Sequence, residues 1–361
     1  MKIGILTFHY AQNYGAVLQC YALQRTLEKC FPDAEISVID YRNQKIVQDY
    51  AVFHLKHKSL YRKLRSLIAS LVYFPQRAKC SRNFKIFTNN YLKIGTSDLS
   101  EYDAIFYGSD QIWNPNITGG VELLYFGAEF GGIKIAYAAS DGNKLSLTEE
   151  IKKSLEEFSE ISVREKSSIE KFKNVNNNIC SVCDPVFLLS KDDWIKKTVL
   201  SKEKNYIFAY KIGENLDFDN EAEKFGQRLG KKVIQAVYVK SLKKIFYKKQ
   251  KLVHGISPLD FVGYIANADF VVTTSFHGTA FSVIFEKPFY SLQIGSYSER
   301  ITDLLENIGL KEQYVKNIPE KIESDIYTDK VKEKIATLRK SGTDFIENLK
   351  EKIFQDIGAE K

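Results

Sequence analysis

A histidine stands between two apolar runs in the stretch TTSFHGTAFSVIF, residues 273–285. The run FVVTTS before it predicts a buried strand, so His277 lies where that strand ends. Ligands of open parallel sheets bind outside the carboxyl ends of the strands. A histidine there could bind an anion or act as a general acid, because its charge changes near neutral pH. Ser275 and Gly278 flank it, and the glycine would let a ligand approach the backbone. The alternative is a core histidine at a tight turn.

Two arginines also follow predicted strands. Arg164 ends the strand in EISVRE, and its planar guanidinium could bind a carboxylate or a phosphate. An ion pair with the neighbouring Glu165 is the alternative. Arg300 closes the run GSYSER, where it supplies a second cation before a short helix.

Two polar loops follow the first and third predicted strands. In TFHYAQNYGA, residues 7–16, Gly15 lies near a helix start, where exposed backbone N–H groups could meet an anion. The loop GSDQIWN, residues 108–114, is suited to gripping a sugar, with Trp113 as a stacking face. The alternative is that Trp113 and Asn114 merely close the loop. The predicted sugar-binding residues in the two loops are His9, Asn13, Tyr14, Gly15, Ser109, Gln111, Trp113 and Asn114.

Several motifs of cofactor and metal chemistry are missing from the sequence. It has no GxGxxG after the first strand, no GxxxxGK[ST], no GxSxG and no HExxH. The five histidines are dispersed, and Cys180 and Cys183 form a lone CxxC inside an apolar run, which favours buried structural thiols over redox or metal chemistry. We therefore expect no metal and no tightly bound cofactor.

Strands and helices alternate along both halves of the chain, which predicts parallel sheets and an α/β fold. In the first half a helix follows the first strand, and another begins at Ser146 with Glu149 in a capping box. In the second half Ser257, Pro258 and Asp260 mark a helix start. The predicted strands are KIGILTF, ISVIDY, DAIFYGS, KIAYAAS, EISVRE and NICSVCDP, then YIFAYKI, KVIQAVY and ADFVVTTS.

A chain of 361 residues suits two domains. We predict two Rossmann-like, doubly wound domains facing a cleft, residues 1–195 and residues 196–328. A helical tail follows over 329–361, bent or broken at Ser341–Gly342.

Residues 50–97 contain ten Lys and Arg and no acidic residue. Basic and apolar groups alternate there at helical spacing, so this basic helical insert could lie on an anionic membrane surface. The alternative is a helical hairpin packed on the domain. No nucleic-acid motif accompanies the charge, and we expect no nucleic-acid partner. The chain shows no signal peptide and no apolar run of the ~20 residues that a spanning helix needs. We expect a cytoplasmic protein, at most peripheral to the inner face of the cytoplasmic membrane.

Taken together, these stretches resemble the polysaccharide pyruvyl transferase family. The resemblance rests on TFHYAQNYGAVLQCYALQ, GSDQIWNP, KIAYAASDG, ISVREKSS and the run from SPLDFVGYIANADFVVTTSFHGTAFSVIFEKPFY to SER. It implies a fold similar to the GT-B glycosyltransferases, phosphoenolpyruvate as co-substrate and a sugar as acceptor. The implied product is a cyclic pyruvate ketal, with release of phosphate. The implied context is bacterial capsule, exopolysaccharide or wall-polymer synthesis, where acceptors are often polyprenyl-linked.

The resemblance also implies that residues 1–195 form the acceptor side and residues 196–328 the donor side, and it assigns roles to single residues. His277 matches the family's donor-site histidine, and Arg164 matches a donor-binding arginine. The family's basic residue after the histidine strand is replaced by Tyr297, for which Arg300 could substitute. Ser275–Phe276 replaces an Arg-Leu pair, so that Arg164 or Arg300 carries more of the donor's charge.

His277 would bind the phosphate and donate a proton to the phosphate or to C3. Asp110 or Glu165 could deprotonate the attacking hydroxyl. Two alternatives remain: a GT-B-type glycosyltransferase that uses a nucleotide sugar, and a non-catalytic saccharide-binding relative.

Overall fold

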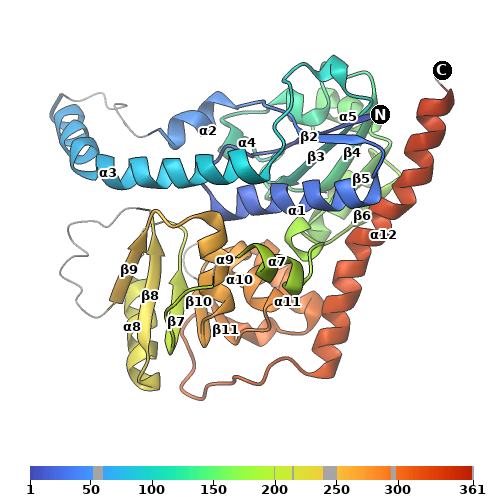
Figure 1. Ribbon diagram of the computed structural model, residues 1–361. Coiled ribbons are helices and arrows are strands. Elements are labelled where there is room, and N and C mark those ends of the chain that lie inside the picture. The colour runs from blue at the N-terminus through green and yellow to red at the C-terminus, as the bar shows by residue number, and fades with distance from the viewer. Residues whose placement is uncertain (52–59, 199, 214, 239–249, 294–297, 360–361) are drawn as a thin grey trace. The chain divides into compact units, whose positions relative to one another are not determined.

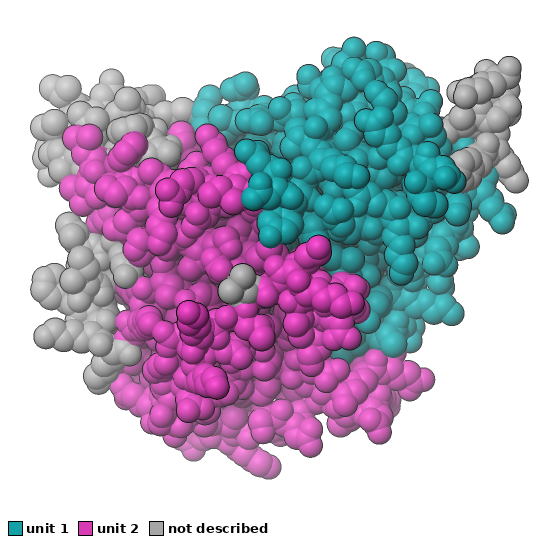
Figure 2. Space-filling view, in the orientation of Figure 1, with its two compact units in different colours: residues 1–49, 88–189, 335–361 teal, residues 50–87, 190–334 magenta. Residues whose placement is uncertain are grey.

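The structure is a computed structural model that describes residues 1–51, 60–198, 200–213, 215–238, 250–293 and 298–359 (Figure 1). The chain divides into two compact units (Figure 2). Unit 1 comprises residues 1–49, 88–189 and 335–361, and unit 2 comprises residues 50–87 and 190–334. The domain boundaries drawn from the sequence stay a prediction. Tyr297 lies outside the described residues.

Unit 1 is built on a six-stranded parallel sheet in the order β2-β1-β3-β4-β5-β6. The order reverses between β1 and β3, which places a topological switch point between these two strands. All six strands expected in the first half of the chain are present. They are β1 (Lys2–Leu6), β2 (Glu35–Val38), β3 (Ala104–Asp110), β4 (Ile133–Ala139), β5 (Glu160–Val163) and β6 (Ile179–Ser181).

The helix after β1, α1, spans Tyr14–Cys30 and buries most of its length, as its apolar spacing predicts. The helix expected from Ser146 begins later, because Thr148 is its N-cap and accepts a hydrogen bond from the N–H of Ile151 at 3.3 Å. The remaining short helices of the unit are α2 (Gln44–Asp49), η1 (Leu99–Glu101), α4 (Pro115–Thr118), η2 (Leu123–Phe126), α5 (Glu149–Glu156), α6 (Lys166–Phe172) and η3 (Pro185–Phe187).

Unit 2 holds a second six-stranded parallel sheet, in the order β12-β11-β10-β7-β8-β9. Counted from β7, this is the strand order 3-2-1-4-5-6 of the Rossmann fold, with the switch point between β7 and β10. The strands are β7 (Tyr206–Tyr210), β8 (Lys232–Val237), β9 (Gln250–His254), β10 (Phe270–Thr273), β11 (Phe289–Leu292) and β12 (Tyr314–Val315).

Helices cover both faces of the second sheet. Successive residues of a strand point to opposite faces: Ile207 and Ala209 pack in the cluster that contains Phe218 of α8, whereas the Phe208 ring lies 5.8 Å from that of Phe261 in α9. The helices of the unit are α7 (Lys191–Lys197), α8 (Leu216–Leu229), α9 (Pro258–Ala266), α10 (Phe276–Ile284), α11 (Glu299–Ile308) and η5 (Lys311–Gln313). The capping box expected at Ser257 and Asp260 is confirmed.

Two long helices correct the sequence predictions. Helix α3 spans Leu60–Tyr91 as one helix with Pro75 inside it, so the hairpin given as an alternative is wrong for these residues, and residues 52–59 of the basic segment lie outside the described part of the chain. Helix α12 spans Asp329–Ala359 without the break expected at Ser341–Gly342. A Cβ added at Gly342 would lie 2.4 Å from the Tyr137 hydroxyl oxygen, so this glycine permits close packing. Within the described residues, none of the helices has the length and apolar character needed to span a bilayer.

Candidate functional site

The carboxyl ends of β1 and β3 are neighbours in the unit 1 sheet. Thr7, which follows β1, donates its hydroxyl proton to the carbonyl oxygen of Ser109 at 2.8 Å. Gln19 of α1 in turn donates to the Thr7 hydroxyl oxygen at 3.0 Å. These bonds join the two predicted sugar-binding loops at the switch point, where ligands of such sheets bind.

The first loop is mostly internal. His9 is 1% exposed, and its Nε2 atom lies 3.2 Å from Oδ1 of Asp40. Burial lowers the pKa of His9, although the hydrogen bond to Asp40 opposes the shift. Tyr14 and Gly15 are buried in the first turn of α1. Asn13 is partly exposed and caps this helix by accepting a hydrogen bond from the N–H of Ala16 at 3.3 Å.

The second loop is ordered by its own hydrogen bonds. Ser109 is buried, and its hydroxyl donates to the carbonyl of Ala138 at 3.2 Å. The backbone N–H of Gln111 donates to Oδ1 of Asp110 at 2.8 Å, and the Asn114 amide donates to Oε1 of Gln111 at 3.0 Å.

Trp113 does not offer a stacking face to a sugar in this structure. The side chain is 1% exposed and lies parallel to the Phe126 ring, with 5.6 Å between the ring centroids. Its indole N–H donates to the carbonyl of Tyr125 at 2.8 Å, as a buried indole requires. The alternative weighed from the sequence, that Trp113 closes the loop, is what the structure shows.

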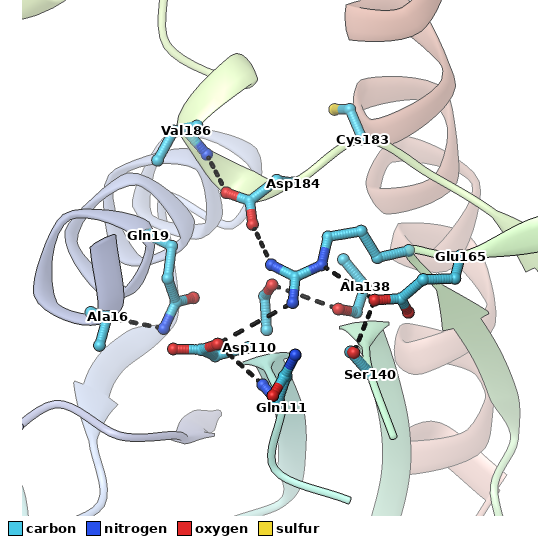
Figure 3. A network of polar contacts seen from close by, with 12 residues as sticks. Ala16, Gln19, Asp110, Gln111, Ala138, Ser140, Glu165, Cys183, Asp184 and Val186 are labelled. Carbon is cyan, nitrogen blue, oxygen red and sulfur yellow. Dashed lines mark hydrogen bonds and ion pairs between the residues drawn. The ribbon is translucent and has the colours of Figure 1, made fainter. Parts of the chain in front are cut away.

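Arg164 lies among three carboxylates at the carboxyl ends of β3, β5 and β6. Its Nη1 donates to Oδ2 of Asp184 at 2.6 Å. Its Nη2 lies 3.9 Å from Oδ1 of Asp110, and its Nε lies 3.8 Å from Oε1 of Glu165. Burial disfavours the charged guanidinium, but Asp184, Glu165 and Asp110 outweigh it and raise the pKa of Arg164. Figure 3 shows the three carboxylates converging.

The three carboxylates differ in access to solvent. The side chain of Asp184 is fully buried and that of Glu165 is 3% exposed, whereas that of Asp110 is 15% exposed. Glu165 accepts a hydrogen bond from the Ser140 hydroxyl at 2.7 Å, and Asp184 accepts one from the N–H of Val186 at 3.1 Å. Asp110 has a φ of 77°, a left-handed conformation that is uncommon for residues other than glycine. Asp110 is therefore the member of this group that a substrate reaches most directly.

In unit 2 the histidine of the opening motif lies at the switch point between β7 and β10. Ser275 caps α10, and its hydroxyl oxygen accepts a hydrogen bond from the N–H of Gly278 at 3.4 Å. His277 is in the first turn of this helix and is 7% exposed. The hydroxyl of Thr274 accepts a hydrogen bond from the N–H of Ile212 at 3.0 Å, which ties the two strand ends together.

Gly278 has a structural role in addition to any contact with a ligand. A Cβ at this position would lie 2.3 Å from Oγ1 of Thr273, at the end of β10. The absence of a side chain lets α10 begin close against the strand that precedes it. This packing keeps His277 near the end of the strand.

Arg300 is placed near the histidine loop by an aromatic contact. Its guanidinium carbon lies 5.8 Å from the centroid of the Phe276 ring, within the range of a cation–π interaction. Phe276 precedes His277 in the chain. The structure thus brings Arg300, Ser275, His277 and Gly278 together in unit 2, and Asp110, Arg164 and Glu165 together in unit 1.

Three site residues were missed in the sequence. Asp184 and Ser140 contact the Arg164 group, and Lys211 follows β7 with its Nζ 2.8 Å from Oδ2 of the buried Asp219. All three stand one to three residues after a strand, a signal that could have identified them. The partners of Asp184 and Ser140 follow another strand, and the partner of Lys211 lies in α8, which spacing along the chain does not reveal.

The cysteine pair has the properties of ordinary thiols. Cys183 is buried as expected, but Cys180 is exposed, so the expectation of two buried thiols is wrong for Cys180. Desolvation raises the pKa of Cys180 to about 11 and that of Cys183 to about 12, so neither is a ready thiolate at neutral pH. Among the residues that the structure describes, no three or more His, Cys, Asp or Glu side chains are grouped to hold a metal ion.

Comparisons with known proteins place the fold and the family. A family model described as polysaccharide pyruvyl transferase matches residues 13–296. The structure is similar to that of a Listeria monocytogenes protein assigned as a UDP-N-acetylglucosamine 2-epimerase, with a TM-score of 0.54 and 10% identity over 100% of this chain and 97% of that one. It is also similar to UDP-GlcNAc 2-epimerase from Methanocaldococcus jannaschii, with a TM-score of 0.51 and 12% identity over 97% and 99% of the chains. The comparison with curated proteins returned no match.

At these identities the structural likeness shows the fold alone. The two parallel sheets and this likeness confirm the predicted fold class, two Rossmann-like, doubly wound domains of the GT-B-like type.

Proposed function

Because the chain belongs to the polysaccharide pyruvyl transferase family, and is thus a transferase, we propose that it transfers the enolpyruvyl group of phosphoenolpyruvate to a sugar. The product is a cyclic pyruvate ketal on a bacterial surface polysaccharide, such as a capsule or an exopolysaccharide, or on its precursor. The observation that carries this proposal is the position of His277, in the first turn of α10 at the switch point of the second sheet.

The donor requires positive charge, since phosphoenolpyruvate carries a carboxylate and a phosphate. Unit 2 supplies it from two sources: the N-terminus of α10, which favours anions, and Arg300, whose guanidinium lies against Phe276. We assign His277 to the phosphate, with Ser275 at the same helix start. Arg164, which the resemblance implies as a donor ligand, is surrounded by carboxylates in unit 1. Its contact with the donor stays a prediction.

The reaction needs an acid and a base. Protonation of C3 leaves an oxocarbenium-like C2, and the oxygen of a sugar hydroxyl attacks this carbon as its proton passes to a base. A second hydroxyl then forms the other C–O bond, and phosphate leaves with the electron pair of its own C–O bond. The two sugar hydroxyls lose one proton each. In the overall balance, one of these protons makes up for the proton that C3 gains, and the other is carried away by the phosphate. His277 is the proposed acid, and Asp110 is the proposed base because it is the most exposed carboxylate of its group.

The acceptor site is proposed around Asp110. Asn13, Gln111 and Asn114 offer amide groups near the same loops, whereas the buried Trp113 is left out of the proposed sugar contacts. The acceptor is expected to be a saccharide with two hydroxyls close enough to be bridged by one carbon, and it could be polyprenyl-linked.

Titration calorimetry tests the donor assignment. Phosphoenolpyruvate should give saturable heat, and His277→Ala and His277→Gln should weaken its binding by about tenfold or more, the effect of losing one charge-assisted hydrogen bond. His254→Gln, at the end of β9, is the matched control and should bind as the wild type does. Binding of UDP-GlcNAc in place of phosphoenolpyruvate would indicate a nucleotide-sugar glycosyltransferase. Phosphoenolpyruvate binding that is unchanged in both His277 variants would contradict the assigned role.

A peripheral membrane contact is also proposed, through α3. Leu71, Val72 and Phe74 of this helix are exposed apolar side chains within the basic segment 50–97. Apolar groups beside basic ones are typical of segments that bind anionic bilayers. The protein should float with vesicles that contain phosphatidylglycerol and not with pure phosphatidylcholine vesicles. Leu71→Asp/Phe74→Asp should abolish flotation, and Val121→Asp, an exposed apolar position in unit 1, should not. If the two variants float to the same extent, the proposed membrane contact is wrong.

A further inference from the structure

The carboxyl ends of β7 and β10 meet at the switch point of unit 2. After β7 the chain continues into α8, which packs on one face of the sheet through Phe218. After β10 it continues into α10 on the other face, where the Phe281 ring lies 6.3 Å from that of Phe261 in α9. Ligands of open sheets bind where the chain diverges in this way. Thr274 is the first residue after β10 and lies at this point.

The two threonines at the end of β10 differ in what their hydroxyls do. Thr273 is fully buried; its hydroxyl donates to the carbonyl of Tyr210 at 2.7 Å and accepts from the N–H of Ser275 at 3.0 Å. Thr274 is partly exposed, and its hydroxyl oxygen accepts from the N–H of Ile212 at 3.0 Å. Within the described residues, no acceptor for the Thr274 hydroxyl proton is seen.

The bond from Ile212 decides what kind of ligand Thr274 can bind. A hydroxyl that accepts a hydrogen bond directs its own proton elsewhere, and it becomes a stronger donor. The group that receives this proton must be an acceptor. Arg300, against the Phe276 ring, and His277, in the first turn of α10, favour an anionic one.

A buried ion pair fixes the chain that carries Ile212. Nζ of Lys211 lies 2.8 Å from Oδ2 of Asp219, and the two side chains are only 3% and 8% exposed. Oδ1 of Asp219 accepts a hydrogen bond from the Gln235 amide in β8 at 2.8 Å. This pair holds the residue next to Ile212, whose N–H in turn sets the orientation of the Thr274 hydroxyl.

We propose that Thr274 is a further ligand of the donor, and that its hydroxyl donates a hydrogen bond to an oxygen of the donor's phosphate. The inference rests on the proposed function for the identity of that donor, phosphoenolpyruvate. The phosphate is favoured over the carboxylate because His277, which is assigned to the phosphate, follows Thr274 by three residues at the same strand end.

Titration calorimetry on the full chain tests this contact, with phosphoenolpyruvate and inorganic phosphate as separate ligands. Thr274→Val keeps the shape of the side chain and should weaken the binding of both ligands by about tenfold or more, the effect of losing one hydrogen bond to a charged group. Thr274→Ser keeps the hydroxyl and should bind both ligands as the wild type does. Thr328→Val, before α12, also removes a hydroxyl that accepts from a backbone N–H, and it should change neither affinity.

Pyruvate separates a lost contact from a distorted site, because it has the carboxylate of the donor and lacks the phosphate. If Thr274 contacts the phosphate, Thr274→Val should bind pyruvate as the wild type does. An equal loss for all three ligands would mean that the variant distorts the site, and the proposal would be wrong. It would also be wrong if Thr274→Val bound inorganic phosphate as tightly as the wild type, or if Thr274→Ser bound it as weakly as Thr274→Val.

Two further outcomes are kept apart by the choice of ligands. If Thr274→Val does not fold, Thr274→Ala removes the same hydroxyl with a smaller side chain and takes its place in the comparison. If the wild type binds inorganic phosphate or UDP-GlcNAc but not phosphoenolpyruvate, the proposed function fails. The affinity of the Thr274 variants for inorganic phosphate then still decides whether this hydroxyl is a phosphate ligand.

Discussion

Two histidines, His9 and His277, follow strands that lie at switch points, but the surroundings of their side chains differ. His277 stands in the first turn of α10, whereas His9 is enclosed and bonded to Asp40. The sequence predicts both as site residues because both follow an apolar run. Burial of the His9 ring depends on Asp40, which comes from the end of another strand, and this contact is not visible in local spacing.

The enclosed His9 should make the fold sensitive to acid. Burial lowers the pKa of His9, so the folded state favours the neutral ring, and the unfolded chain binds more protons below the ordinary value of about 6.5. Its contribution to stability is complete above that pH and is lost as the pH falls toward the folded-state value. Between about pH 7.5 and pH 5.5, wild type should lose more free energy of unfolding than His9→Gln.

Urea denaturation at the two pH values measures this difference. His254→Gln removes a histidine that is not fully buried and serves as the control, which should follow the wild type. If His9→Gln loses as much stability as the wild type over this range, His9 is not the group that titrates.

At the same scale, residue types at strand ends identified most of the candidate site. His277, Arg164, Asp110 and Glu165 all follow strands, and the sequence is sufficient to place them there. It is not sufficient to show that Asp184 is the closest partner of Arg164, because the two are 20 residues apart and meet only when β5 and β6 pair. The prediction that Trp113 stacks on a sugar failed for a related reason. The carbonyl that accepts the hydrogen bond of its indole N–H belongs to Tyr125, which lies in η2.

Among the elements, the predicted strands and the helix start at Ser257 are confirmed, whereas the helix start at Ser146 and the predictions for the two long helices are wrong. Alternating apolar patterns and the Ser257 capping box are local signals, and the structure bears them out. That α3 is a single helix and that α12 is unbroken depend on how these helices pack, which local signals do not show. A glycine inside a charged helix suggests a break, but Gly342 of α12 is instead set against Tyr137 and Cys183.

Gly342 should therefore be intolerant of a side chain. Its Cβ would lie 2.4 Å from the Tyr137 hydroxyl oxygen, 2.6 Å from the Cys183 sulfur and 2.9 Å from a methyl carbon of Leu188. Glycine to alanine in an exposed helix gains about 1 kcal/mol, but overpacking costs about 1–3 kcal/mol. Gly342→Val adds the larger clash and should destabilise the protein and make α12 more accessible to protease.

Glu347→Val places the same side chain at an exposed position of α12 and is the matched control. Thermal unfolding and limited proteolysis compare the two variants. Equal stability and equal cleavage would show that the contact of Gly342 with Tyr137 does not hold α12 in place.

For the whole molecule, the fold class could be predicted because strand patterns and helix patterns alternate along the sequence. The strand orders could not, since the sheets of the two units differ: β2-β1-β3 at the switch point of one, β11-β10-β7 at that of the other. The local sequence pattern also does not show which distant segments of the chain pack together in one unit. Residues 335–361 belong with unit 1, where Ile346, Leu349 and Ile353 of α12 are buried.

This division of unit 1 into three segments has a consequence for the nascent chain. All six strands of its sheet are synthesised well before residue 335, yet the helix that covers Tyr137 and Cys183 is synthesised after all of unit 2. At a synthesis rate of about 5–20 residues per second, the residues between the second and third segments take roughly 7–30 s to synthesise. For that time the surface against which α12 packs has no helix to cover it. Unit 2 needs nothing beyond residue 334. Unit 1, whose first segment precedes unit 2 in the chain, is therefore completed after unit 2.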